Sequence, residues 1–144
     1  MAKLILNMAA MQEDFFADTA MIGIATAMPA YHLCWELNRH FDINFERDPE
    51  QNIISQKKDN QYYFPIYQCV FPNSNHKYLL YKLKNGPETL LPEAKHLDYV
   101  WMVQTANSGH DATDIARELK KIPDVQLAQI LTNDQLKSLN NLLM

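Results

Sequence analysis

Glu93 and Asp98 could form an acid–base pair, and both lie in the stretch 91–99. Such catalysis needs two groups that converge on one reacting atom and have pKa values separated by their environments. Neither carboxylate has a nucleophile, a metal-ligand spacing or a glycine-rich loop near it in the sequence. We therefore expect structural roles. Glu93 should begin a short helical turn after Pro92, and Asp98 should be mostly buried and hydrogen-bonded at a strand start.

The five histidines form no pattern that is typical of a metal site. The chain has no HxH or HExxH pair and no cysteine–histidine cluster with zinc spacing. His32 and His40 are eight residues apart on one predicted helix. They would stand about 12 Å apart at the usual helical rise, too far to share one ion. The sequence thus predicts no metal, no cofactor and no catalytic residues, and enzymes are the least favoured class.

A speculative ligand loop is formed by Ser108, Gly109 and His110, which we expect to precede the second main helix. Helix N-termini attract small anions, so this loop could hold one. Asp111, the predicted N-cap, opposes a second negative charge there. A capped helix without a ligand is therefore the favoured interpretation.

Aromatic residues are concentrated between Gln61 and Phe71, with lysines nearby. On an RNA-binding sheet the aromatic side chains occupy the open face among basic residues. In this chain they alternate onto both faces, which indicates core packing or a subunit contact. The net charge of −4 also argues against non-specific nucleic-acid binding.

Length and composition predict a single α+β domain spanning residues 1–144. Apolar residues make up 47% and charged residues 21%, which excludes a disordered chain. Cys34 and Cys69 lie among apolar residues, so we expect buried, reduced thiols. No stretch approaches the roughly 18 apolar residues of a membrane span, and we expect a cytoplasmic protein with no membrane partner.

The apolar periodicity predicts a strand–helix–strand unit, a hairpin and a second strand–helix–strand unit. The expected strands are 3–8, 21–27, 43–47, 61–71, 76–84, 97–105 and 125–131, and the expected helices are 29–41 and 111–122, with short helical turns after 92 and at 132–139. Asp48, Pro49 and Glu50 should end the third strand. This order predicts a mostly antiparallel sheet with a ferredoxin-like (split βαβ) core and extra strands.

The residues Leu91-Pro92-Glu93 and, three residues later, Leu97-Asp98-Tyr99 resemble the motif that names the IPExxxVDY family of small bacterial proteins. Leu91 stands for isoleucine and Leu97 for valine, and both swaps nearly conserve volume. Further segments resemble the family over most of the chain, among them Ile22-Gly23-Ile24. The resemblance implies no activity and no catalytic residues, because the family is uncharacterised.

Two helices can cover only one face of a sheet, so the strand 97–105 should expose Val100 and Met102 on its other face. Soluble monomers rarely expose a large apolar patch of this kind. We therefore expect a non-enzymatic protein-interaction or homodimeric binding module. The alternative is a regulatory small-molecule-binding domain similar to amino-acid-binding regulatory domains.

Overall fold

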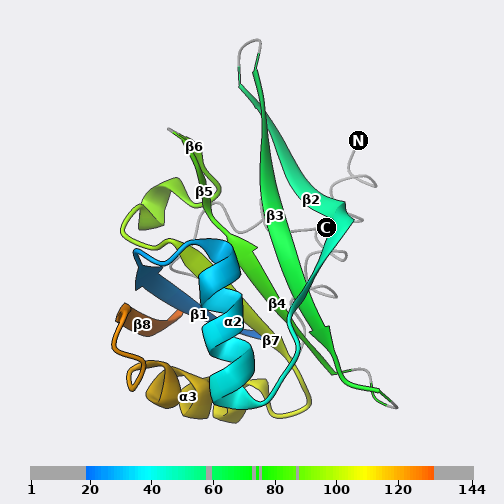
Figure 1. Ribbon diagram of the computed structural model, residues 1–144, viewed down its shortest axis with the longest axis vertical. Coiled ribbons are helices and arrows are strands. Elements are labelled where there is room, and N and C mark those ends of the chain that lie inside the picture. The colour runs from blue at the N-terminus through cyan, green and yellow to red at the C-terminus, as the bar shows by residue number, and fades with distance from the viewer. Residues whose placement is uncertain (1–18, 58–59, 73, 75, 87, 132–144) are drawn as a thin grey trace, which may run out of the picture.

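The computed structural model describes residues 19–57, 60–72, 74, 76–86 and 88–131. Its centre is one sheet of six antiparallel strands in the order β2-β3-β4-β7-β1-β8 (Figure 1). The strands are β1 (Thr19–Thr26), β2 (Glu46–Lys57), β3 (Asn60–Val70), β4 (Lys77–Lys82), β7 (Tyr99–Gln104) and β8 (Val125–Leu131). The expected strand 3–8 and helical turn 132–139 lie outside the described residues.

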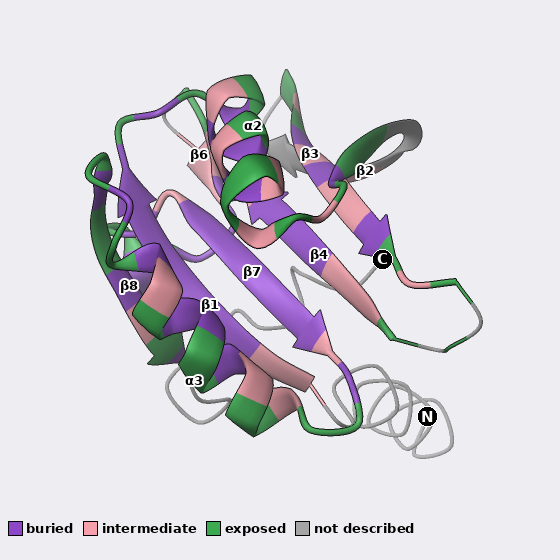
Figure 2. Ribbon diagram, turned by 60° about the horizontal axis from the view of Figure 1, so that its bottom comes forward, coloured by how far each residue is buried: buried purple, intermediate pink, exposed green. Residues whose placement is uncertain are grey.

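Two helices, α2 (Ala30–Phe41) and α3 (Ser108–Leu119), lie on the same face of this sheet (Figure 2). A small two-stranded sheet, β5 (Lys84–Asn85) and β6 (Glu88–Thr89), and the 3-10 turn η1 (Pro92–Ala94) come between β4 and β7. The predicted α+β class, the mostly antiparallel sheet and the two main helices are thus confirmed.

The first core lies between the helices and the sheet. The buried stripe of α2 has helical spacing, and that of α3 contains Leu119. Trp101 of β7 is fully buried at the centre of this core. The rings of Phe41 and Phe45 each meet it edge-on at 5.1 Å between centroids. Leu33 and Leu37 of α2, Leu119 of α3 and Ile122 after it are all buried in this core.

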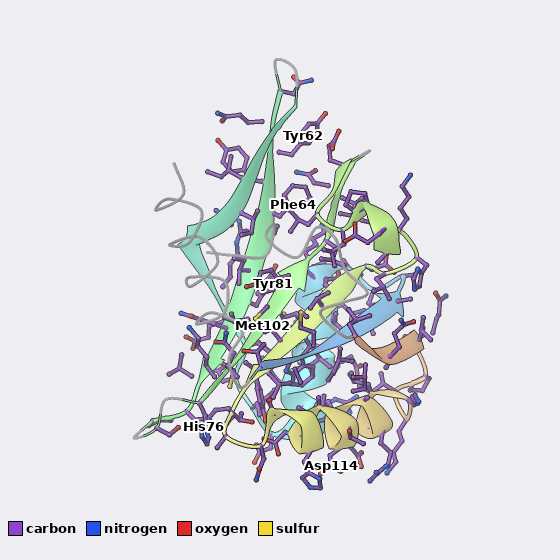
Figure 3. All side chains as sticks on the ribbon, turned by 180° about the vertical axis from the view of Figure 1, so that it is seen from behind. Tyr62, Phe64, His76, Tyr81, Met102 and Asp114 are labelled. Carbon is purple, nitrogen blue, oxygen red and sulfur yellow. The ribbon has the colours of Figure 1, made fainter. Side chains whose placement is uncertain are left out.

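A second core lies on the opposite face of the sheet, and it corrects the expectation of an exposed patch. Val100 and Met102 are fully buried within a single chain. Leu91, Ala94 and Leu97 pack into this core from the segment around η1. Figure 3 views the molecule from this side, and Phe64, Tyr81 and Met102 follow one another there across β3, β4 and β7. The prediction was wrong because it counted only helices as cover for a sheet face.

The strand expected to end at Asp48-Pro49-Glu50 continues through these residues to Lys57 as β2. β2 lies at the edge of the sheet, where a proline removes no donor that a neighbouring strand requires. The pairing of β2 with β3 shifts register between Arg47 and Asn52. The proline therefore lies at an irregularity within β2 and does not end the strand.

Candidate functional site

The segment that carries the family resemblance joins the two cores. Leu91 and Leu97 are fully buried in the second core. Tyr99 is buried in the first core, and its hydroxyl donates a hydrogen bond to the carbonyl oxygen of Met28 at 2.9 Å. Burial raises the pKa of Tyr99, and the neighbouring Tyr67, Cys34 and Asp98 raise it further, so this donor stays protonated. The apolar motif residues are structural.

Asp98 holds the C-terminal end of β1. Its carboxylate accepts hydrogen bonds from the backbone N–H of Thr26 at 2.9 Å and from Nζ of Lys84 at 3.1 Å. Its own N–H donates to the carbonyl oxygen of Ile24, and its carbonyl oxygen accepts from the N–H of Leu83. The expected hydrogen bonding is confirmed, but the side chain remains 29% exposed, so it is only partly buried.

Gly23 of β1 makes room for the motif residue Leu97. A Cβ at Gly23 would lie 2.5 Å and 2.9 Å from the two Cδ atoms of Leu97. A glycine inside a strand is typical of close packing or of a bulge, and here the close approach of Leu97 shows close packing. The tight fit fixes the η1 segment against the sheet.

Glu93 and Pro92 are exposed in η1, as expected for a helical turn that begins with proline and a carboxylate. Asp98 lines a surface pocket, whereas Glu93 does not. The two carboxylates do not share that pocket, and this arrangement supports their structural roles.

The pocket beside Asp98 has a volume of about 270 Å³ and lies where β1 leads into α2. Its lining residues are Thr26, Ala27, Met28, Pro29, Lys82, Lys84, Asp98 and Tyr99. Lys84 is paired with Asp98, whereas the ammonium of Lys82 has no hydrogen-bonding or ionic partner among the described residues. The lining carries one more positive than negative charge, so it suits a small anion better than a cation.

Ser108, Gly109 and His110 do not form the expected loop, because they are the first three residues of α3. Asp111 is therefore not the N-cap. It lies in the first turn and accepts a hydrogen bond from the hydroxyl of Thr105 at 2.6 Å. The Asp111 carboxylate thus contacts the segment before the helix, and the residue at the N-cap is Asn107, without a side-chain cap hydrogen bond. Asp111, and Asp114 beside His110, leave negative charge next to this turn, so the structure adds nothing in favour of an anion there.

The two cysteines are free and buried. Burial raises the pKa of the Cys34 thiol to about 12, so it is not an activated nucleophile. Within the described ranges, no three or more histidine, cysteine, aspartate or glutamate side chains are placed to hold a metal ion. Neither of the two described helices is long and apolar enough to cross a membrane.

Sequence reasoning missed an exposed surface on α2, here called the α2 surface and formed by Tyr31, Trp35 and Arg39. Tyr31 is 79% and Trp35 58% exposed. The guanidinium carbon of Arg39 lies 4.8 Å from the centre of the Trp35 ring. The signal was present, because these residues recur every four positions outside the buried stripe of the helix.

The α2 surface is turned away from α3. His40 on the far flank of α2 bonds to Glu118 of α3 at 3.1 Å. Asn38 lies on the flank of Tyr31 and Trp35, and its side chain accepts from the N–H of Phe45 at 2.7 Å, just before β2. Tyr31 and Trp35 therefore lie on the flank of α2 that is nearer to β2 and β3, two strands that can be located in Figure 1.

Two further exposed apolar residues, Ile54 and Tyr63, are opposite each other on β2 and β3. Tyr63 has the same strand phase as Tyr67 and Cys69, which pack in the helix-side core. Ile54 and Tyr63 consequently face the same side of the sheet as α2. Apolar surface is therefore exposed on both the helix and the neighbouring hairpin.

Comparison with known proteins finds no relative: no family model, no curated protein and no solved structure matches the chain.

Proposed function

We propose that the chain is a non-enzymatic protein-interaction module that binds a partner protein through the α2 surface. The observation that carries this proposal is the exposure of Tyr31 and Trp35 side by side on one helix flank. Tryptophan, tyrosine and arginine are the residue types most enriched where protein interfaces gain their binding energy. The α2 surface consists of one of each.

Contacts within the chain hold part of the α2 surface, Trp35 and Arg39, in place. Glu36 holds Arg39 in an ion pair at 3.0 Å, and Arg39 in turn covers the Trp35 ring. Association costs free energy for each flexible side chain that it immobilises. A surface whose side chains are already held in place therefore loses less binding free energy when a partner immobilises them. Ile54 and Tyr63 offer a second apolar contact on the same side of the sheet.

We further infer that β1, α2, β4, β7, α3 and β8 form a ferredoxin-like (split βαβ) core. The spatial order β4-β7-β1-β8, with antiparallel neighbours throughout and both helices on one face, supports this assignment. The hairpin β2–β3 is then an insertion between α2 and β4, and it extends the sheet beside the α2 surface (Figure 1). Membership of the IPExxxVDY family stays a prediction.

Affinity capture tests the interaction. Wild-type chain and the variants Trp35→Ala and Tyr31→Ala are immobilised, and cytosolic proteins retained by each are quantified by mass spectrometry. Val70→Ala is the matched control, because Val70 is an exposed apolar residue on β3. A partner should be retained by wild type and by the control and lost from both α2 variants.

The captured partner is then purified and titrated into the wild-type chain. Trp35 is exposed and Trp101 is fully buried, so a shift of the emission to shorter wavelength would report that Trp35 leaves water. Equal capture by wild type and Trp35→Ala would refute the proposal, as would binding without any change in emission.

A second candidate function is the regulatory binding of a small anion, and the lone ammonium of Lys82 in the pocket beside Asp98 favours it. The probes are inorganic phosphate and acetate, and the measured quantity is the midpoint temperature of thermal unfolding. Added anion should raise this temperature for the wild-type chain and leave it unchanged for Lys82→Ala. Lys120→Ala, a lysine remote from this pocket, is the control. An equal rise in all three chains would mean that the ions act non-specifically.

A further inference from the structure

β8 is an edge of the sheet, since among the described strands it pairs only with β1. Its sequence, Val-Gln-Leu-Ala-Gln-Ile-Leu, has no charge and no proline. Edge strands present unpaired N–H and C=O groups, and proteins usually protect them with charges, prolines or bulges. The register of β8 shifts only at its start, next to Val125, so 127–131 are regular. The opposite edge, β2, has both a proline and charged residues.

The side chains of β8 make this edge apolar on both faces. Ile130 is 42% exposed and pairs with Ile22, whose side chain is in the helix-side core. Leu127 is 37% exposed and has the opposite phase, that of Leu131 in the second core. A groove of about 510 Å³ runs between α3 and this strand, and Arg117 lies in its wall.

We propose that a second copy of this chain adds its own β8 to this edge in antiparallel orientation. The two sheets then continue into each other across a twofold axis, and α3 lies beside its counterpart. This surface is separate from the α2 surface, so the inference goes beyond the proposed function.

Side-chain complementarity favours a second copy over another peptide. With the twofold axis at Gln129, the middle of the regular stretch, Leu127 lies opposite Leu131 of the second copy, and Ala128 lies opposite Ile130 of the second copy. Every pair is then apolar except the two central glutamines, whose amides can bond to each other. No charges of the same sign meet along the strands.

The helix α3 lies beside this edge. Its flank toward β8 consists of Thr113, Ala116, Arg117 and Lys120, none of them acidic, whereas Asp111 bonds to Thr105 on the other flank. The apolar pairing along β8 is therefore what identifies the occupant, and a closed twofold dimer is the commonest arrangement of a single chain.

Light scattering after gel filtration measures the mass of the full chain. The expected mass is twice 16.7 kDa for wild type. Ile130→Lys and Leu127→Lys put a charge on the edge strand, and each should give the mass of one chain with an unchanged circular dichroism spectrum. Val70→Lys is the control, because it charges an exposed apolar position on another strand and should leave the dimer intact.

A cysteine at the proposed axis tests the pairing itself. Gln129→Cys should yield a disulfide-linked dimer under mild oxidation, because symmetric positions on paired strands lie within disulfide distance. The native Cys34 and Cys69 are buried and should not contribute. A wild-type mass of one chain at about 100 μM, well above the range where stable dimers dissociate, would overturn the proposal. So would a dimer that survives Ile130→Lys but is lost in Trp35→Ala, which would assign self-association to the α2 surface.

Discussion

Asp98 connects three segments that are far apart in the sequence. Its carboxylate binds the end of β1 at Thr26 and the side chain of Lys84, and its backbone joins Ile24 to Leu83. An ionised carboxylate has two acceptor oxygens, so Asp98 accepts from the N–H of Thr26 with one oxygen and from Nζ of Lys84 with the other. Asp98 is therefore a structural residue even though it borders a pocket.

The two bonds of the Asp98 side chain should differ in their contribution to stability. Asp98→Ala leaves the N–H of Thr26 without its acceptor, and we expect a loss of about 1–3 kcal/mol in the free energy of unfolding. Asp98→Asn keeps an acceptor oxygen and loses only a partly exposed ion pair with Lys84, for a loss of about 0–1 kcal/mol. Urea melts measure both. Equal losses would show that the ion pair dominates.

Gly23 should tolerate no side chain while Leu97 is present. The Cβ of Gly23→Ala would overlap the Cδ atoms of Leu97, and we expect a loss of about 1–3 kcal/mol. Leu97→Val removes those atoms at a cost of about 1 kcal/mol. The double variant should be more stable than the sum of the two losses predicts, by about 1 kcal/mol.

Gly109→Ala is the matched control for the glycine experiment. Among the described residues, nothing lies within 4 Å of a Cβ at Gly109, which is in the first turn of α3. This substitution should stabilise the chain by about 0.4–1 kcal/mol. Strictly additive losses for Gly23→Ala and Leu97→Val would contradict the close contact.

At the scale of the elements, apolar periodicity predicted the two helices and the buried strand β7 well. The buried stripe of α2 and the alternation of Trp101 with Val100 and Met102 are direct consequences of burial, so the spacing of apolar residues in the sequence predicts them. The course of β2 through Pro49 was not predictable, because it depends on β2 being an edge strand. Strand order is a property of the whole chain and leaves no local pattern.

The candidate site was less predictable than the fold. The sequence singled out 91–99 and assigned it a structural role, which the contacts of Leu97 and Asp98 support. It did not single out Trp35, because a helical pattern separates buried from unburied positions but does not tell which unburied apolar residues stay in water. The start of α3 at Ser108 was not predicted, because its N-cap, Asn107, makes no side-chain cap hydrogen bond and Asp111 offered a more typical capping residue.

The helices should depend strongly on their buried leucines. Leu37 of α2 and Leu119 of α3 are both fully buried, and alanine at either position should cost about 2–5 kcal/mol. Tyr31→Ala on α2 is the control, because a side chain this exposed should change the free energy of unfolding by less than about 0.5 kcal/mol. Denaturant melts with losses below 1 kcal/mol at Leu37 and Leu119 would contradict the observed helix orientation.

At the scale of the whole molecule, one sheet supports two cores. Neighbouring residues of β4 point to opposite faces, so Leu80 packs under the helices and Leu79 packs in the second core. The second core leaves no open sheet face at the centre of the molecule. Apolar surface remains exposed only toward the rim of the described structure, on α2, on the β2–β3 hairpin and along β8.

The two cores should unfold together, because every central strand contributes side chains to both. In a Trp35→Phe background, Trp101 is the remaining tryptophan and reports the helix-side core. Leu79→Ala and Leu80→Ala, one for each face, should each lower the free energy of unfolding by about 2–5 kcal/mol. In both variants the urea transitions measured by Trp101 fluorescence and by far-ultraviolet circular dichroism should coincide, as they do for a two-state domain. If Leu79→Ala moved the circular dichroism transition to lower urea while the Trp101 transition stayed in place, the second core would be an independent unit, and the sheet would not couple its two faces.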